Sequence, residues 1–425
     1  MKRVRELCTS RPILSWALYD WANSVFATTV IAGFFPVFFK QYWSAGTDAV
    51  TSTAQLGFAN SIGSVFILIA APILGAIADG GALRKKFLAA FTGLGVAGSA
   101  GLWFVGQGDW STAAIVYVLG SIGFSGAIIF YDALITAVSP PSRYDEVSAF
   151  GFSLGYIGGG LLFAVNVAMT LSPDTFGLAG AAEAVRLSFV TVAAWWLVFS
   201  IPLFRYVPEP PKVDAKADAT ASAAAAGLRS LAKTLREYRA HRMAGLFLLA
   251  YFFYIDGVHT IIRMAVDYGL ALGFPAESLI VALLIVQFVG FPAALAFGFA
   301  AARIGPKPAL YFGVVVYVAV TVWAYFMTTV AEFYVLAVVV GLVQGGVQAI
   351  SRSLYARFVP AEQSGKFFGF FNMIGRFAAI IGPSLVAVTG LLTGSSRLGI
   401  LSIIIVLVIG MVLLTFVRER EPTAA

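Results

Sequence analysis

The chain has 425 residues, of which 60% are hydrophobic and only 12% are charged. A soluble domain needs a more polar surface, so this composition excludes a soluble enzyme or binding module and predicts a protein whose solvent is largely lipid. The net charge of +7 does not indicate nucleic-acid binding, because the basic residues stand between apolar runs and form no basic face. The single cysteine, Cys8, excludes an intramolecular disulfide and a thiolate metal cluster.

Long apolar runs recur along the chain, and each can cross a hydrocarbon core of about 30 Å as a helix. We count about twelve, which predicts an all-α membrane protein. The runs of the first half are residues 13–40, 54–78, 87–106, 112–138, 148–171 and 185–206. Those of the second half are residues 244–271, 279–302, 310–329, 333–359, 367–392 and 398–417. The first run is too long for the apolar core of a signal peptide and contains Asp20, so we expect a retained helix.

Lys and Arg concentrate in the loops that follow the even-numbered runs and at both chain ends. These residues include Arg84, Lys85, Lys86, Arg143, Arg303, Lys307, Arg418 and Arg420. Cytoplasmic loops retain positive charge during insertion, so both termini are expected in the cytoplasm. A basic chain with short loops and little cysteine suits a multi-pass protein of a bacterial inner membrane, and we expect a monomer in the bilayer.

One long polar segment, residues 207–243, divides the chain near its middle. It opens with prolines and continues as an alanine-rich tract, which is typical of a linker. We therefore predict a six-helix bundle in residues 1–206, a cytoplasmic linker in 207–243 and a second six-helix bundle in 244–425. The end of the linker has leucines on one helical face and basic residues on the other. That pattern fits a helix on the anionic inner leaflet or a solvated basic helix equally well.

The two halves retain traces of an internal repeat. Asp20 in YDWANS corresponds to Asp256 in DGVHT, at the same place in the first helix of each half. The fourth helix with its loop resembles the tenth helix with its loop, and in that comparison Tyr131 falls opposite Arg352. The matches together predict two pseudo-symmetric bundles.

The loop after the second run reads GAIADGGALRKK and resembles the G-x-x-x-D-x-x-x-x-R-[RK] signature of the major facilitator superfamily. The resemblance implies a gating role for Gly75, Asp79, Arg84 and Lys85, in which charge contacts break and re-form as the halves rock. The alternative is a basic turn that only fixes topology. The matching loop of the second half has Ala302 in the place of the acid, which weakens the case for a second gate.

Three further segments, YDWANS, YIDGVHTII and GGVQAISRS, make the chain similar to the vacuole effluxer-like permeases and their bacterial relatives. The resemblance covers nearly the whole chain. It implies the major facilitator fold and export of amino acids or similar small solutes. His259 departs from the pattern, where we expect Asn, and this departure can alter the substrate or the coupling.

Polar side chains inside the apolar runs are costly in hydrocarbon, so they usually face a cavity or a partner. Asp256, His259 and Arg263 share one helical face, with Asp256 roughly 18 Å from Ala244 and therefore near the mid-plane. One face of the tenth run, which carries Gln344, Gln348 and Arg352, is rich in hydrogen-bond donors and suits a carboxylate. The residues predicted to bind the substrate or to couple its transport are Asp20, Asn23, Tyr131, Asp132, Asp256, His259, Arg263, Gln344, Gln348, Arg352 and Arg376.

A purely structural alternative pairs these charges with each other, Asp256 with Arg263 or Asp20 with Arg376. Both roles can coexist, since a buried pair that exchanges partners is a switch.

The sequence gives no support for an enzyme or an ATP-driven pump. It has two histidines, no H-E-x-x-H motif and no phosphate-binding loop. We therefore predict a secondary active transporter that moves a small solute by alternating access, with no cofactor and no metal. Protons are the expected coupling ion, because a buried carboxylate beside a cation can load and release a proton when helices move. A multidrug or sugar carrier of the same fold is the alternative, and a channel or a non-transporting scaffold is less favoured.

Overall fold

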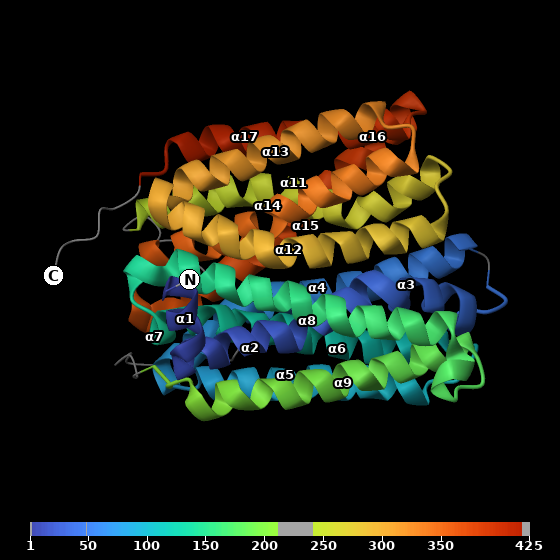
Figure 1. Cartoon of the computed structure of the whole chain (residues 1–425), viewed down its shortest axis with the longest axis horizontal. Helices are drawn as coiled ribbons and strands as arrows, with labels where there is room; N and C mark the ends of the chain where they lie inside the picture. Colours follow the sequence, from blue (N-terminus) through green and yellow to red (C-terminus); the bar gives the residue numbers. More distant parts are fainter. Residues whose placement is uncertain (1, 48, 211–240, 419–425) are drawn as a thin grey trace.

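The computed structural model describes residues 2–47, 49–210 and 241–418 as a bundle of long helices, and this part contains no β-strand. The helices run side by side along one axis, with the first helix and the end of the last helix on the same side of the bundle (Figure 1). Ten helices of the described part are long and apolar enough to cross a membrane. The predicted all-α membrane architecture is therefore confirmed.

The N-terminal elements begin with a short polar helix and continue with long apolar ones. They are α1 (Lys2–Thr9), α2 (Arg11–Val25), α3 (Phe35–Phe38), α4 (Ala49–Gly81), α5 (Arg84–Gly101), α6 (Trp110–Ala133), α7 (Ile135–Val138), α8 (Tyr144–Leu171) and α9 (Ala181–Tyr206). The π-helical stretch Phe26–Phe34 joins α2 to α3, and a second one, Phe39–Trp43, follows α3 within the same candidate span. Wide turns of this kind are rare and occur frequently at functional sites.

The C-terminal elements repeat this pattern of long antiparallel helices. They are α11 (Arg242–Ala271), α12 (Ala276–Ile304), α13 (Pro306–Phe326), α14 (Val330–Phe358), α15 (Ser364–Thr393), α16 (Ser396–Leu401) and α17 (Ile403–Thr415). Ten of the predicted runs coincide with the candidate spans, and the other two, 54–78 and 367–392, lie within α4 and α15. The total of twelve spans, the cytoplasmic termini and the domain limits stay predictions. Residues 211–240 of the predicted linker and its amphipathic helix lie outside the described residues.

The element bounds refine the internal repeat. Helices α7 and α14 end at Val138 and Phe358, and the next long helices start at Tyr144 and Ser364, with the same spacing in the sequence. This alignment places Asp132, one residue away from the predicted Tyr131, opposite Arg352. The sequence comparison was displaced by one position because apolar helices offer many near-equivalent alignments.

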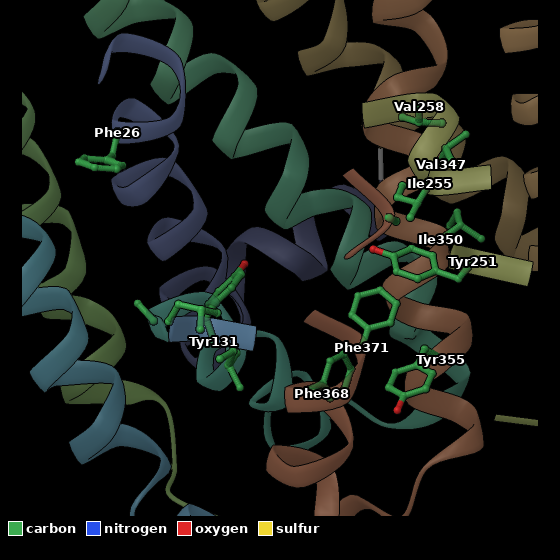
Figure 2. Close-up of a cluster of buried hydrophobic side chains, with 14 of the residues drawn as sticks. Phe26, Tyr131, Tyr251, Ile255, Val258, Val347, Ile350, Tyr355, Phe368 and Phe371 are labelled. Carbon is green, nitrogen blue, oxygen red and sulfur yellow. The ribbon is translucent and has the colours of Figure 1, made fainter. Parts of the chain in front are cut away.

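The N-terminal and C-terminal helices meet along two long contacts, α8 with α12 and α4 with α15. Small residues allow the close approach: a Cβ on Gly75 of α4 would collide with the backbone carbonyl of Gly365 on α15. Aromatic side chains fill the core of the C-terminal helices, where Phe371 stacks on Tyr251 and Tyr355 with ring centroids 4.4 and 5.0 Å apart (Figure 2). These packed layers fix the helices that carry the polar residues.

Candidate substrate cavity and gate

A cavity of about 520 Å³ lies between the N-terminal and C-terminal helices. All the predicted substrate or coupling residues line it except two. The lining members of the prediction are Asp20, Asn23, Tyr131, Asp132, His259, Arg263, Gln344, Gln348 and Arg352. Asp256 is not among the lining residues, and the side chain of Arg376 lies outside the described residues. Polar side chains from distant runs thus meet in one space, as the cost of burying them in lipid predicts.

Arg352 of α14 is the centre of a buried network at the floor of this cavity. Its Nη1 donates to Asp132 Oδ1 at 2.9 Å, its Nε donates to Ser148 Oγ at 2.8 Å, and its Nη2 donates to the Ser148 carbonyl at 3.0 Å. Nη2 also lies 3.6 Å from Asp20 Oδ2. The side chains of Arg352 and Asp132 are almost fully buried, which makes these charge-assisted bonds strong and their loss costly.

The remaining oxygens of the two carboxylates have other donors. Tyr131 donates its hydroxyl to Asp20 Oδ2 at 2.8 Å, and Asn372 donates to Asp132 Oδ2 at 3.1 Å. Trp16 stacks on the Tyr131 ring with centroids 4.6 Å apart, and the Arg352 guanidinium lies over Trp16. Asp20 therefore pairs with Arg352. Asn372, a hydrogen-bond donor of this network, was not predicted from the sequence.

Arg263 on α11 is in a different situation from Arg352. It lines the cavity and is exposed to it, and it has no hydrogen bond or ion pair with any described residue. The predicted structural pair with Asp256 does not form within 4.0 Å, although the two groups are close enough to interact electrostatically. A guanidinium that projects into a cavity in this way is available to an anionic group of a ligand.

Amide side chains extend the polar wall of the cavity away from Arg352. Gln287 of α12 donates to Thr28 Oγ1 at 2.6 Å, which links the C-terminal helices to the π-helical stretch after α2. Gln344 and Gln348 lie one turn apart on α14 and line the same space. The cavity thus offers carbonyl and amide groups beside one guanidinium whose charge is not neutralised.

The signature loop after α4 connects the two sets of helices at the end where the termini lie. Asp79 accepts hydrogen bonds from Arg84 Nε at 2.7 Å and from the backbone N–H groups of Gly365 and Lys366 at 3.0 and 2.8 Å. Arg84 also donates to the Glu362 carbonyl. Carboxylates are stabilised at a helix N-terminus, so Asp79 fastens α4 to the start of α15.

The second basic residue of the signature, Lys85, makes contacts of a different kind. Lys85 Nζ donates to the carbonyls of Phe204 and Val207 at 2.8 and 2.7 Å, at the C-terminal end of α9. The backbone N–H groups of Arg84 and Lys85 donate to the Glu209 carboxylate. Lys85 therefore ties the loop to its own half, while Asp79 and Arg84 reach across to the other half.

A second connection between the halves was not predicted from the sequence. Arg357 near the end of α14 donates to Asp145 Oδ2 at the start of α8, and Ser353 donates to Asp145 Oδ1 at 2.5 Å. A Cβ on Gly298 of α12 would contact the Asp145 carbonyl, so α12 also packs closely here. An acid of the N-terminal half thus makes a cross-half contact beside α12, the C-terminal helix that has Ala302 in the place of the signature acid. The only sequence signal for this contact is the carboxylate of Asp145 in the first turn of a long helix.

The cavity extends toward the opposite end of the bundle. Its walls include Leu279, Met327, Phe333 and Ile400, which lie within a few residues of helix ends on that side. The polar contacts of Asp79, Arg84 and Asp145 with the other half lie at the terminus end instead. The described arrangement is therefore closed at the terminus end, with its cavity reaching toward the other.

Solved transporter structures share this arrangement of helices. The human organic anion transporter MFSD10 superposes with a TM-score of 0.73 at 16% identity, over 95% of this chain and 99% of that one. The transporter FucP in its outward conformation gives a TM-score of 0.70 at 14% identity, over 96% of this chain and 100% of that one. The described helices therefore have the fold of the major facilitator superfamily.

Residues 9–140 and 138–423 match the family described as vacuole effluxer Atg22 like, and the chain belongs to this family. The uncharacterized MFS-type transporter YxiO of Bacillus subtilis is 42% identical over 412 residues, which are 96% of this chain and 95% of that protein. Autophagy-related protein 22 of Yarrowia lipolytica is 28% identical over 272 residues, which are 57% of this chain and 45% of that protein. The resemblance noted in the sequence is confirmed.

Proposed function

We propose that the protein exports a small carboxylate-bearing solute, such as an amino acid, by alternating access driven by the proton gradient. The observation that carries the proposal is the contrast between the two arginines of the cavity. Arg352 is neutralised by Asp132 and Asp20, whereas Arg263 faces the cavity with no polar partner among the described residues. A carboxylate that displaces water from Arg263 would gain a charge-assisted, bidentate contact.

The contacts at the terminus end support the alternating part of the proposal. Every polar partner of Arg352 belongs to the N-terminal helices, and Asp79 holds the first turn of α15. When the halves rock, these contacts would break, the cavity would open at the terminus end and close at the other. The solute would then meet water on one side of the membrane at a time.

Proton coupling rests on the carboxylates that the cavity and its surroundings contain. Asp20 and Asp132 share one arginine in the described state, so opening the terminus end would expose two carboxylates that need new partners. A proton that binds to one of these carboxylates would neutralise its charge in place of Arg352. Export follows from membership in the effluxer family and is part of the proposal.

The test is uptake into liposomes of a labelled panel of amino acids, sugars and organic cations, with and without an imposed proton gradient. We expect saturable uptake of a carboxylate-bearing solute. Arg263→Gln should raise its KM by about 10- to 100-fold, because a hydrogen bond to a charged group contributes about 1.5–3 kcal/mol. Arg303→Gln, at the exposed end of α12, is the matched control. Accumulation of a sugar or an organic cation with Arg263→Gln unaffected would contradict the proposal and support the alternative carriers.

A further inference from the structure

The surroundings of Asp256 do little to compensate the charge of its carboxylate. It is 1% exposed, it does not line the solute cavity, and neither carboxylate oxygen has a hydrogen-bond partner of normal geometry among the described residues. A buried carboxylate without a donor or a counter-charge costs several kcal/mol. Arg263, two turns further along α11, interacts with Asp256 electrostatically but forms no ion pair with it, so a cation bound directly to the carboxylate would lower this cost further.

Two neighbours define a recess around this carboxylate. Thr260 lies one turn further along α11, is fully buried, and its hydroxyl also lacks a partner. Gly382 of α15 faces both side chains: a Cβ there would collide with Thr260 Oγ1 and stand 2.9 Å from Asp256 Oδ2. Two unpartnered oxygens, Thr260 Oγ1 and Asp256 Oδ2, thus lie against a position where only glycine fits. The next residue, Pro383, has no N–H to donate within α15, which frees a backbone carbonyl one turn earlier.

The N-terminal half contains the same construction with its charge satisfied. Asp20 and Ser24 are one turn apart on α2 and face Gly151 and Gly155 of α8, where a Cβ would stand 2.8 Å from Asp20 Oδ2 and 2.6 Å from Ser24 Oγ. There the carboxylate has Tyr131 as a donor and Arg352 nearby. The C-terminal recess resembles this one in its carboxylate, its hydroxyl one turn later and a facing glycine, but Asp256 forms no ion pair with a described residue.

No described charged side chain of the surrounding elements forms an ion pair with Asp256. Arg263 and His259 are the titratable side chains of α11 near Asp256, and both line the solute cavity. Helix α17, which packs on α11, has no titratable residue. On α14, Arg352 is engaged by Asp132 and Ser148. On α15, the described charged side chain is Lys366, near the start of the helix, about 16 residues and some 24 Å before Gly382.

We propose that Asp256 and Thr260, beside Gly382, form the binding site of the coupling cation, a proton or Na⁺, separate from the solute cavity. The proposal rests on the proposed function, which requires a coupling ion. A cation bound to Asp256 neutralises the carboxylate charge on α11 in the described state. Without it, the carboxylate has only the more distant Arg263 to compensate its charge when the halves are closed at the terminus end, so the cation favours return to this state. The solute at Arg263 and the cation at Asp256 then act on the same helix.

The test uses the whole protein in liposomes and in detergent. In liposomes, Asp256→Asn should keep solute counterflow within about twofold of the parent and lower gradient-driven accumulation at least tenfold. Gly382→Ala fills the recess and should do the same, whereas Gly390→Ala on the same helix has open space around it and should behave as the parent. A proton gradient and a Na⁺ gradient are applied separately: response to either one identifies the cation, and response to neither overturns the proposal.

A measurement without the solute separates this site from the proposed function. In detergent, the melting temperature of the parent should rise with Na⁺ or with falling pH, and Gly382→Ala should lose that rise while Gly390→Ala retains it. If the parent shows no counterflow with any solute but its cation-dependent shift is lost in Gly382→Ala, the transport proposal fails and the cation site stands. If Asp256→Asn keeps the full cation dependence and concentrating power of the parent, Asp256 is a structural residue only and the site is refuted.

Discussion

Replacing Arg352 with alanine should shift the protein away from the arrangement closed at the terminus end. All its polar partners, Asp132, Ser148 and Asp20, belong to the N-terminal helices, so its contacts exist only while the two halves are together. Arg352 is 2% exposed and Asp132 is 5% exposed. Removing one member of such a buried pair costs about 3–5 kcal/mol, because the remaining charge is left without compensation.

The penalty falls mainly on the closed state, since opening at the terminus end would bring the two carboxylates to water. At about 1.4 kcal/mol per tenfold change, the ratio of open to closed molecules should rise about a hundredfold to a few thousandfold. A mere loss of packing around Arg352 would weaken both states and would leave this ratio nearly unchanged.

The shift can be read from one distance across the terminus end. Spin labels at Ser142→Cys and Ala361→Cys, both exposed and in loops of opposite halves, are attached after the native Cys8 has been replaced with serine. Pulsed electron resonance should show a longer-distance population in Arg352→Ala. Arg303→Ala should give the parent distribution. If Arg352→Ala is folded and its distances match those of the parent, the network does not hold the halves together.

Three further predictions concern the gate and the topology. Gly75→Ala should slow transport at least tenfold, because its Cβ would collide with backbone of α15 that cannot move aside, while Gly93→Ala, with open space around it, should transport normally. Arg357→Gln should lower transport and increase the reactivity of cysteines at the terminus end, and Asp145→Asn should reproduce this; parental rates in both would refute a second cross-half contact. The native Cys8 is exposed, so a membrane-impermeant thiol reagent should label it only from the cytoplasmic side; labelling in intact cells would reverse the orientation.

The sequence predicts the cavity residues better than their partners. Polar side chains are expensive in lipid, so Asp20, Asp132 and Arg352 had to face an internal space, and they do. The spacing of residues along a helix does not show which of these groups form pairs. Asp256 and Arg263 share a face, but they lie two turns apart on one helix, and only Arg263 reaches the cavity.

Contacts between distant helices explain the other differences. Asp145 looked like a residue at the start of a helix, and only the packing of α8 beside α14 brings it to Arg357. The recess at Asp256 depends on the absence of a side chain at Gly382, more than a hundred residues later in the chain. A single sequence offers many glycines in apolar helices and does not show which one leaves space beside a carboxylate.

The central claim is that one solute occupies the cavity and crosses by alternating access. The most direct measurement is counterflow: liposomes containing the protein are loaded with an excess of the unlabelled solute identified by the panel, and entry of a labelled trace is followed without any ion gradient. The account predicts a transient, saturable overshoot of label that disappears in Arg263→Gln and remains in Arg303→Gln. Label that enters at the same rate with and without internal solute, or a current that rises linearly with voltage, would contradict it.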